Sequence, residues 1–191
     1  DTTILPGAYQ IKEYLPLLQR KRVGLVINQT SMIGNTSLLD SLLHLGVDVK
    51  KIFIPEHGFR GTDSNGATIS NSTDQKTGLP LISLYGKNKK PKSTDLKGLD
   101  LIIFDIQDVG VRFYTYISTL HYIMESCAEN NIEILVFDRP NPNGFYIDGP
   151  VLDTQFRSFI GMHPIPIVYG LTIGELSKMI QGEEWINKAK S

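Results

Sequence analysis

The chain has 191 residues, a hydrophobic content of 41%, a formal net charge of -1 and a single cysteine. These values fit one globular domain with a full core, and the lone cysteine excludes an intrachain disulfide and a cysteine-based zinc site. The near-neutral charge and the lack of a long apolar run argue against a nucleic-acid partner and a membrane span.

The first part of the chain alternates between strand and helix patterns. Residues 22–27 are rich in Val, Leu and Ile, which predicts a strand buried on both faces of a parallel sheet. Residues 37–45 predict a helix with a leucine-rich face, closed by Gly46. Residues 49–54 predict a second strand, and the polar stretch over residues 58–78 predicts a long loop.

The alternation continues through the middle of the chain. Residues 81–84 predict a short strand, and the basic segment over residues 87–92 predicts a solvated loop. The apolar run over residues 99–106 predicts a strong strand. Residues 115–129 then repeat apolar side chains at helical spacing, which predicts a helix with Cys127 in the core.

The last elements complete an α/β pattern. Residues 132–137 predict a strand. A final helix is expected after Thr172, because Thr172 as N-cap and Glu175 three residues later form a capping box. Strands that alternate with helices predict a mainly parallel sheet with helices on both faces and right-handed crossovers. Gly24 and Gly34 do not form a dinucleotide fingerprint, and no phosphate-binding loop motif is present.

Polar residues follow the expected strands at the points where these strands end. The carboxyl ends of parallel strands meet at one edge of a sheet, and ligands commonly bind there. We therefore expect these residues to line one crevice. They are Asn28 and Gln29; Glu56 and His57; Asp105, Gln107 and Asp108; and Asp138, Arg139, Asn141 and Asn143.

Glu56 is the leading candidate for a catalytic group. It follows an apolar strand and sits between Pro55 and His57, so its carboxyl can be partly desolvated, which raises its pKa and suits a general acid. The alternative is a residue that only hydrogen-bonds loop amides at a strand end. His57 could relay protons or orient Glu56, or it could be a structural donor.

The acidic pair that brackets Gln107 has more than one interpretation. Asp105 and Asp108 could share acid-base work with Glu56, hold a hard cation such as magnesium, or stabilise a loop. No third ligand is evident in the sequence, so we expect no metal.

Two further segments suit ligand binding. Arg112, Tyr114 and Tyr116 lie in an aromatic stretch at the start of the expected helix, where rings could stack on a sugar; Tyr116 could instead belong to the core. Two prolines stiffen residues 138–144, which suits a binding loop but is also typical of an ordinary turn.

A series of short motifs extends in order along nearly the whole chain and resembles the NamZ-type exo-β-N-acetylmuramidases. The motifs are Asn28-Gln29-Thr30, Pro55-Glu56-His57-Gly58-Phe59-Arg60-Gly61, Thr77-Gly78-Leu79-Pro80, Ser83-Leu84-Tyr85-Gly86, Asp105-Ile106-Gln107-Asp108-Val109-Gly110, Arg112-Phe113-Tyr114-Thr115-Tyr116, Asp138-Arg139-Pro140-Asn141-Pro142, Asp148-Gly149-Pro150, Ser158-Phe159, Pro164-Ile165-Pro166, Tyr169-Gly170 and Thr172-Ile173-Gly174-Glu175-Leu176.

The resemblance implies a Rossmann-like domain that carries the catalytic cleft of a glycoside hydrolase. Such an enzyme releases terminal N-acetylmuramic acid from the non-reducing ends of peptidoglycan fragments and needs no cofactor. The family's proposed acid maps to Glu56, and its tyrosines near the reacting sugar map to Tyr114 and Tyr116. The second catalytic group stays open between Asp105, Asp108, a tyrosine and the acetamido group of the substrate.

The expected substrate carries a lactyl carboxylate, which calls for a cation. Arg60, Arg112 and Arg139 are the candidates, with Arg139 or Arg60 preferred. The remaining polar residues of the crevice are expected to bind the sugar.

The family's chains continue into a smaller second domain, so residues 1–191 are expected to be the Rossmann-like catalytic domain alone. If the second domain closes the cleft, this domain by itself would bind substrate weakly or be inactive. The substrate predicts a location in the bacterial periplasm, in the cell envelope or outside the cell.

Two other classes of function fit parts of the pattern. A metal-dependent phosphoesterase could use Asp105, Asp108 and His57. A non-catalytic module that binds cell-wall sugars could use the same crevice without hydrolysis.

Overall fold

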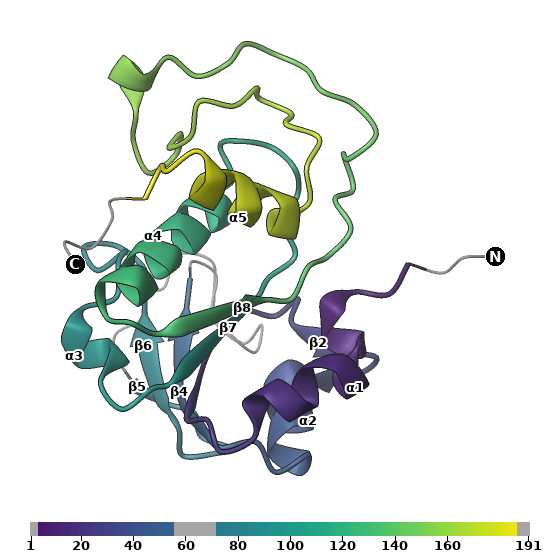
Figure 1. Ribbon diagram of the computed structural model, residues 1–191, viewed down its shortest axis with the longest axis vertical. Coiled ribbons are helices and arrows are strands. Elements are labelled where there is room, and N and C mark those ends of the chain that lie inside the picture. Colours follow the sequence, from purple (N-terminus) through teal and green to yellow (C-terminus); the bar gives the residue numbers. More distant parts are fainter. Residues whose placement is uncertain (1–3, 56–71, 187–191) are drawn as a thin grey trace.

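The computed structural model describes residues 4–55 and 72–186, and its centre is a six-stranded sheet in the order β5-β6-β4-β1-β7-β8 (Figure 1). Neighbouring strands run parallel, except that β5 is antiparallel to β6. The strands are β5 (Ser72–Thr73), β6 (Pro80–Ser83), β4 (Val49–Ile54), β1 (Val23–Ile27), β7 (Leu101–Asp105) and β8 (Glu133–Val136). A separate two-stranded ladder joins β2 (Met32–Ile33) to β3 (Thr36–Ser37).

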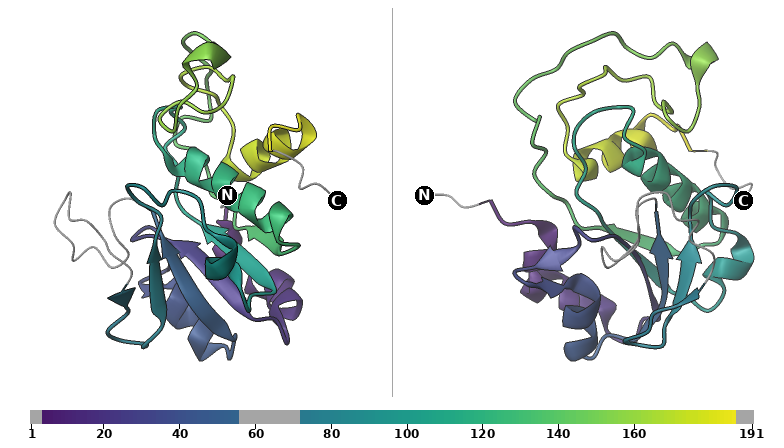
Figure 2. Two further views of the ribbon diagram at one scale, coloured as in Figure 1. Left: turned by 90° about the vertical axis from the view of Figure 1, so that its left-hand side faces the viewer. Right: turned by 180° about the vertical axis from the view of Figure 1, so that it is seen from behind.

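Helices cover both faces of the sheet, which confirms the predicted α/β class (Figures 1 and 2). One layer contains α4 (Tyr116–Glu129) and α5 (Ile173–Gly182), and the other contains α1 (Ile11–Tyr14) and α2 (Leu38–His44). Shorter helices are α3 (Ser93–Leu96) and the 3-10 turns η1 (Gly7–Tyr9), η2 (Leu15–Leu18) and η3 (Thr154–Phe156).

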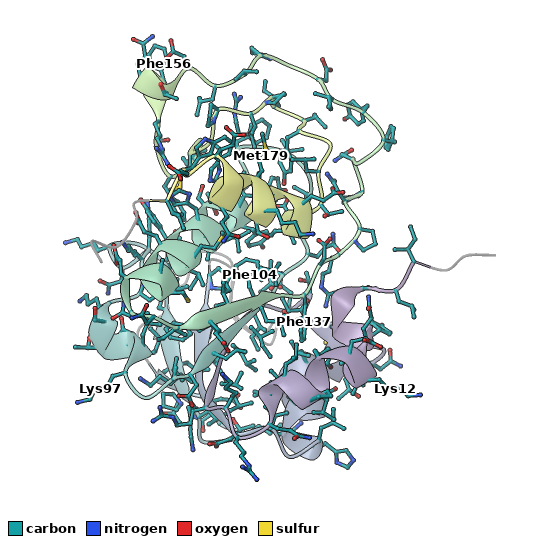
Figure 3. The ribbon with its side chains drawn as sticks, in the orientation of Figure 1. Lys12, Lys97, Phe104, Phe137, Phe156 and Met179 are labelled. Atoms are coloured by element: carbon teal, nitrogen blue, oxygen red, sulfur yellow. The ribbon has the colours of Figure 1, made fainter. Side chains whose placement is uncertain are left out.

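Strands β1 and β7 are buried at every residue because each face of the sheet has its own core. Val26 and Phe104 pack in the cluster with α4 and α5, whereas Leu25 and Ile103 pack in the cluster with α2. Figure 3 shows Phe104 between the sheet and the upper helices. Successive strand residues point to opposite faces, so both faces must be apolar, as the continuous apolar runs predicted.

The caps predicted at Gly46 and Thr172 are present, and Ser37 adds one that was not predicted. Ser37 accepts a hydrogen bond from the amide of Asp40 at the start of α2, and Gly46 follows that helix with a φ of +77°. Thr172 and Glu175 form the expected capping box of α5. Cys127 is buried in α4, also as expected. No helix among the described residues is long and apolar enough to cross a membrane.

Several parts of the fold were not predicted: the short elements β2, β3 and α3, the strand β5 within the predicted loop over residues 58–78, and two larger features. The first is the set of short helices from η1 to η2, where Tyr14 packs against Phe137 and closes the lower face. The second is a long excursion from β8 to α5, which arches over α5 (Figure 1). Bridges between Asp148 and Val168 hold its outgoing and returning segments together. Phe156 lies at its outer end (Figure 3).

A pair of buried histidines joins α4 to this excursion. Nδ1 of His121 lies 3.1 Å from Nε2 of His163, and the His163 ring packs against Trp185 at a centroid distance of 5.4 Å. Burial lowers the pKa of His121 to about 4 and that of His163 to about 3. Both rings are therefore neutral near pH 7.

This pair predicts a loss of stability in mild acid. The unfolded chain binds protons near the ordinary histidine pKa of 6.5, whereas the folded chain does not until the pH is far lower. As the pH falls from about 6.5 to about 5, the free energy of unfolding should decrease by about 1.4 kcal/mol per pH unit for each histidine. Urea unfolding at a series of pH values measures this slope.

The matched variant is His163→Phe, which keeps an aromatic ring beside Trp185 but removes one titrating group. Its slope in the same pH range should be smaller by the contribution of one histidine. Equal slopes in the two proteins would contradict the assignment.

Candidate active site

The carboxyl ends of β4, β1, β7 and β8 lie next to one another, as the sequence predicted for the polar clusters. Ile27, the last residue of β1, is in register with Asp105, the last residue of β7. Asn28 follows β1 directly, and Asp138 follows β8 after Phe137. Glu56, His57 and Arg60 lie outside the described residues.

The centre of this edge is a buried ion pair between Asp105 and Arg139. Nε of Arg139 lies 2.6 Å from Oδ1 of Asp105, and Nη2 lies 2.9 Å from Oδ2. Asp105 is fully buried and Arg139 is 8% exposed. Burial raises the pKa of Asp105, while the guanidinium opposes that shift because it stabilises the carboxylate. Nε and Nη2 of Arg139, which together could bind a substrate carboxylate, therefore bind Asp105 instead.

Asp108 is buried but only partly satisfied. Its Oδ2 accepts hydrogen bonds from the amide of Gly110, at 2.8 Å, and from the hydroxyl of Tyr169. Its Oδ1 is buried and has no hydrogen-bond partner in the described structure. Burial raises the pKa of Asp108, and the bond from Tyr169 lowers it. The backbone amides of Gly110 and Val109 lower this pKa as well, and one carboxylate oxygen of Asp108 has no hydrogen bond of good geometry in the described structure.

Asn28 shows the same pattern. Its Oδ1 accepts from the amide of Thr30 at 2.9 Å and from the hydroxyl of Thr30 at 2.6 Å. Its Nδ2 is buried and has no partner among the described residues. A buried donor without a partner costs about 1–3 kcal/mol, so this group suits a ligand acceptor. Gln29, the other residue of this cluster, is exposed.

Gln107 joins the strand ends to the loop after β8. Its amide donates to Thr30 at 3.0 Å, and its Nε2 donates to the carbonyls of Asp108 and Pro140, each at 2.8 Å. These bonds hold the edge together.

The loop after β8 is held by its own amides. Nδ2 of Asn141 donates to the carbonyl of Leu171, and Nδ2 of Asn143 donates to that of Val109, each at 2.8 Å. A Cβ at Gly110 would lie 2.1 Å from Oδ1 of Asn141, so that position needs glycine. The predicted rigidity of this loop is therefore explained, whereas its predicted contact with substrate stays a prediction.

The aromatic stretch before α4 lies at the surface. Phe113 and Tyr114 are about half exposed, and the rings of Tyr114 and Tyr116 are 6.4 Å apart. Tyr116 is partly buried against the core, so both interpretations of that residue stay open. Arg112 donates to the carbonyls of Pro150 and Ile165, which ties the excursion to this segment.

Several site features were not predicted from the residues alone. Tyr169 was recognised only as part of a family motif, and its bond to Asp108 depends on the return of the excursion to the sheet edge. Asp138 binds the hydroxyl of Thr172 and the amide of Gly174 at the start of α5, and this distant contact has no signal in the sequence.

The basic segment 87–92 differs from the predicted solvated loop. Lys89 and Lys90 are partly buried, and Pro91 is buried. Lys90 forms ion pairs of 2.8 Å with both Glu125 and Glu129 on α4. Within residues 4–55 and 72–186, no group of three or more His, Cys, Asp and Glu side chains is arranged to hold a metal ion.

Comparison with known proteins gives consistent matches. Residues 23–190 match the family model described as exo-β-N-acetylmuramidase NamZ, N-terminal. The chain is 46% identical over 186 residues to the peptidoglycan β-N-acetylmuramidase NamZ of Bacillus subtilis (strain 168), which covers 95% of this chain and 43% of that protein. The chain thus spans less than half the length of this curated relative.

Two crystal structures of DUF1343 family proteins from Bacteroides fragilis NCTC 9343 have the same fold, each with a TM-score of 0.88. One is 46% identical and covers 98% of this chain and 49% of its own. The other is 43% identical and covers 96% of this chain and 47% of its own.

The buried ion pair leads to a stability prediction. Replacing Arg139 by Met should leave the carboxylate of Asp105 buried without its partner, and the free energy of unfolding should fall by about 3–5 kcal/mol. Urea unfolding measures the change.

Arg22→Met is the matched control. Arg22 makes the same two-pronged contact with Asp100, at 2.9 and 2.8 Å, but both side chains are substantially exposed. The free energy of unfolding should fall much less in this variant because solvent screens the Arg22–Asp100 pair. Similar losses in the two variants would show that burial does not decide the strength of the Asp105–Arg139 pair.

Proposed function

The chain belongs to the NamZ family of exo-β-N-acetylmuramidases, and from this premise we propose that it is the Rossmann-like catalytic domain of such an enzyme. The enzyme would release terminal N-acetylmuramic acid from the non-reducing ends of peptidoglycan fragments. The match over residues 23–190 carries this proposal. Asn28 and Asp108, each with a buried polar atom lacking a partner in the described structure, support it because they suit a polar ligand at the sheet edge.

The length of the relatives bears on the proposal. The solved relatives extend about as far again as this chain, which covers 49% and 47% of them. We therefore assign activity to the full-length protein and the catalytic cleft to residues 1–191. Peptidoglycan lies outside the cytoplasmic membrane, so we expect the protein in the periplasm, in the cell envelope or outside the cell.

Glu56 is our candidate for the general acid that protonates the departing glycosidic oxygen. Support comes from its neighbours: Pro55 is buried at the end of β4, and β4 lies beside β1, which ends at Asn28. Desolvation of a carboxyl raises its pKa, which is the property that a general acid needs.

Asp108 is a better candidate than Asp105 for the group that assists at the anomeric carbon. Both oxygens of Asp105 bind Arg139, so this carboxylate is already neutralised. Asp108 has an oxygen without a protein partner in the described structure. An oxocarbenium-like centre needs an oxygen close to it, and we propose that Oδ1 of Asp108, which is buried, supplies one directly or orients a water.

The exposed aromatic side chains before α4 fit a sugar-binding role. Phe113 and Tyr114 are 53% and 49% exposed, and they precede the start of α4 at the carboxyl side of the sheet. Aromatic faces of this kind stack on the apolar face of a pyranose ring. We propose that Tyr114 contacts the substrate in this way.

The variant Glu56→Gln tests the acid. In the full-length protein it should lower turnover of a chromogenic β-N-acetylmuramide by roughly a hundredfold or more, because the amide cannot protonate the leaving oxygen. Circular dichroism should show an unchanged fold. Near-normal turnover would remove Glu56 from this role, and no hydrolysis by the unmodified protein would overturn the proposed function.

The variant Tyr169→Phe tests Asp108. The hydroxyl of Tyr169 lowers the pKa of Asp108, so its removal should raise that pKa. If the reaction uses Asp108 as a carboxylate, the acidic limb of the pH profile of kcat/KM should move to higher pH. An acidic limb at the same pH in both proteins would exclude this role for Asp108.

A further inference from the structure

A separate cavity of about 310 Å³ opens beside the carboxyl end of β6 and the start of α4. Its volume is at the small end of the range for ligand sites. The side chains that give it chemical character are Tyr85, Phe113 and Phe159, which are aromatic, Thr115, and Lys89. It thus combines aromatic walls with one cationic group.

The charge of Lys89 is not paired with a carboxylate among the described residues. No ion pair joins it to any residue in the described part of the chain, whereas its neighbour Lys90 pairs with both Glu125 and Glu129. Nζ of Lys89 instead lies 4.4 Å from the centroid of the Phe159 ring. A cation–π contact of this kind orients the ammonium group without cancelling its charge, so it can still attract an anion.

The wall of the cavity that Phe159 forms is held in place by α4. The hydroxyl of Ser118 donates to the carbonyl of Phe159 at 2.7 Å, and the ring of Phe159 stacks on Tyr122 at 5.8 Å with an interplanar angle of 13°. Because these contacts restrain Phe159, the ring is ordered before a ligand arrives. Preorganised walls lower the entropy cost of binding.

The cavity lies beside the end of β4, the strand that precedes Glu56 in the sequence. The amide of Leu84, which lines it, donates to the carbonyl of Ile54 at 2.8 Å. Ile54 is the last residue of β4 and lies two positions before Glu56 in the sequence. The cavity therefore lies at the same edge of the sheet as the end of β4.

We propose that this cavity binds the carboxylate carried by the amino sugar, with Lys89 as its ion-pair partner and the aromatic side chains against the apolar part of the ligand. The proposal rests on the proposed function and adds a specificity-determining residue to it. Two arginines that the sequence suggested for this carboxylate are engaged elsewhere, Arg139 with Asp105 and Arg112 with backbone carbonyls. Lys89 has no carboxylate or carbonyl partner within residues 4–55 and 72–186, which favours it over these two arginines, and Arg60 lies outside those residues.

Ligand binding to the full-length protein tests the pocket. We expect unmodified protein to bind N-acetylmuramic acid more tightly than N-acetylglucosamine, which has no carboxylate. Lys89→Met should reduce the affinity for N-acetylmuramic acid by about tenfold or more and leave that for N-acetylglucosamine unchanged, because only the charged hydrogen bond is lost. Isothermal titration calorimetry measures both.

Lys87→Met is the matched control. Lys87 is exposed in the same loop and does not line the cavity, so its removal changes the net charge equally without touching the site. Its affinities should equal those of the unmodified protein. Equal losses in the Lys87 and Lys89 variants would reduce the effect to general electrostatics and overturn the proposal.

Two sources could supply the carboxylate: the lactyl group itself or the peptide attached to it. Muramyl dipeptide separates them, because its lactyl carboxyl is an amide while its peptide keeps a carboxylate. Dependence on Lys89 for N-acetylmuramic acid alone assigns the lactyl group, and dependence for the dipeptide alone assigns the peptide. If Lys89→Met changes the affinity for neither ligand, the proposal that this cavity binds the carboxylate is wrong.

Hydrolysis distinguishes failure of the pocket from failure of the proposed function. If the function holds, Lys89→Met should raise KM for a chromogenic β-N-acetylmuramide with little change in kcat. Hydrolysis with an unchanged KM would reject the pocket alone. If unmodified protein does not hydrolyse the muramide, the function fails, and the binding measurements still decide whether Lys89 recognises the acidic sugar.

Discussion

The buried ion pair between Asp105 and Arg139 organises the part of the molecule on which the proposed function depends. It joins the end of the central strand β7 to the loop after β8, and the backbone carbonyl of Asp105 also accepts a hydrogen bond from Ser31 after β1. Three strand ends are thereby held in one arrangement. Such a pair stabilises the fold only while both partners are present, since either charge alone would be buried without compensation.

The polar side chains around this pair, at the carboxyl edge of the sheet, are of two kinds. Gln107, Asn141 and Asn143 use their amides on backbone carbonyls and hold the loops together. Asn28 and Asp108 each keep a buried polar atom without a partner in the described structure. A protein tolerates that cost where a ligand supplies the missing bond, so these two residues are the strongest structural indication of a binding site.

Much of the fold could be predicted from apolar patterns, because strands such as β1 and β7 are buried on both faces and must be apolar throughout. The sequence also located the polar clusters at strand ends. It could not assign their roles: Arg139 is 34 positions from Asp105, and their contact follows from the order of the strands. The excursion after β8 has no apolar period, so neither its path nor the bond from Tyr169 to Asp108 could be foreseen.

The central claim is that the carboxyl edge of the sheet binds an amino sugar. A crystal structure of the full-length protein with N-acetylmuramic acid tests it most directly. We predict that the sugar lies over the ends of β1 and β7, with Nδ2 of Asn28 or Oδ1 of Asp108 within about 2.7–3.2 Å of a sugar atom or of a water bound to the sugar. A sugar bound elsewhere, with both of these atoms still without a ligand contact, would contradict the account.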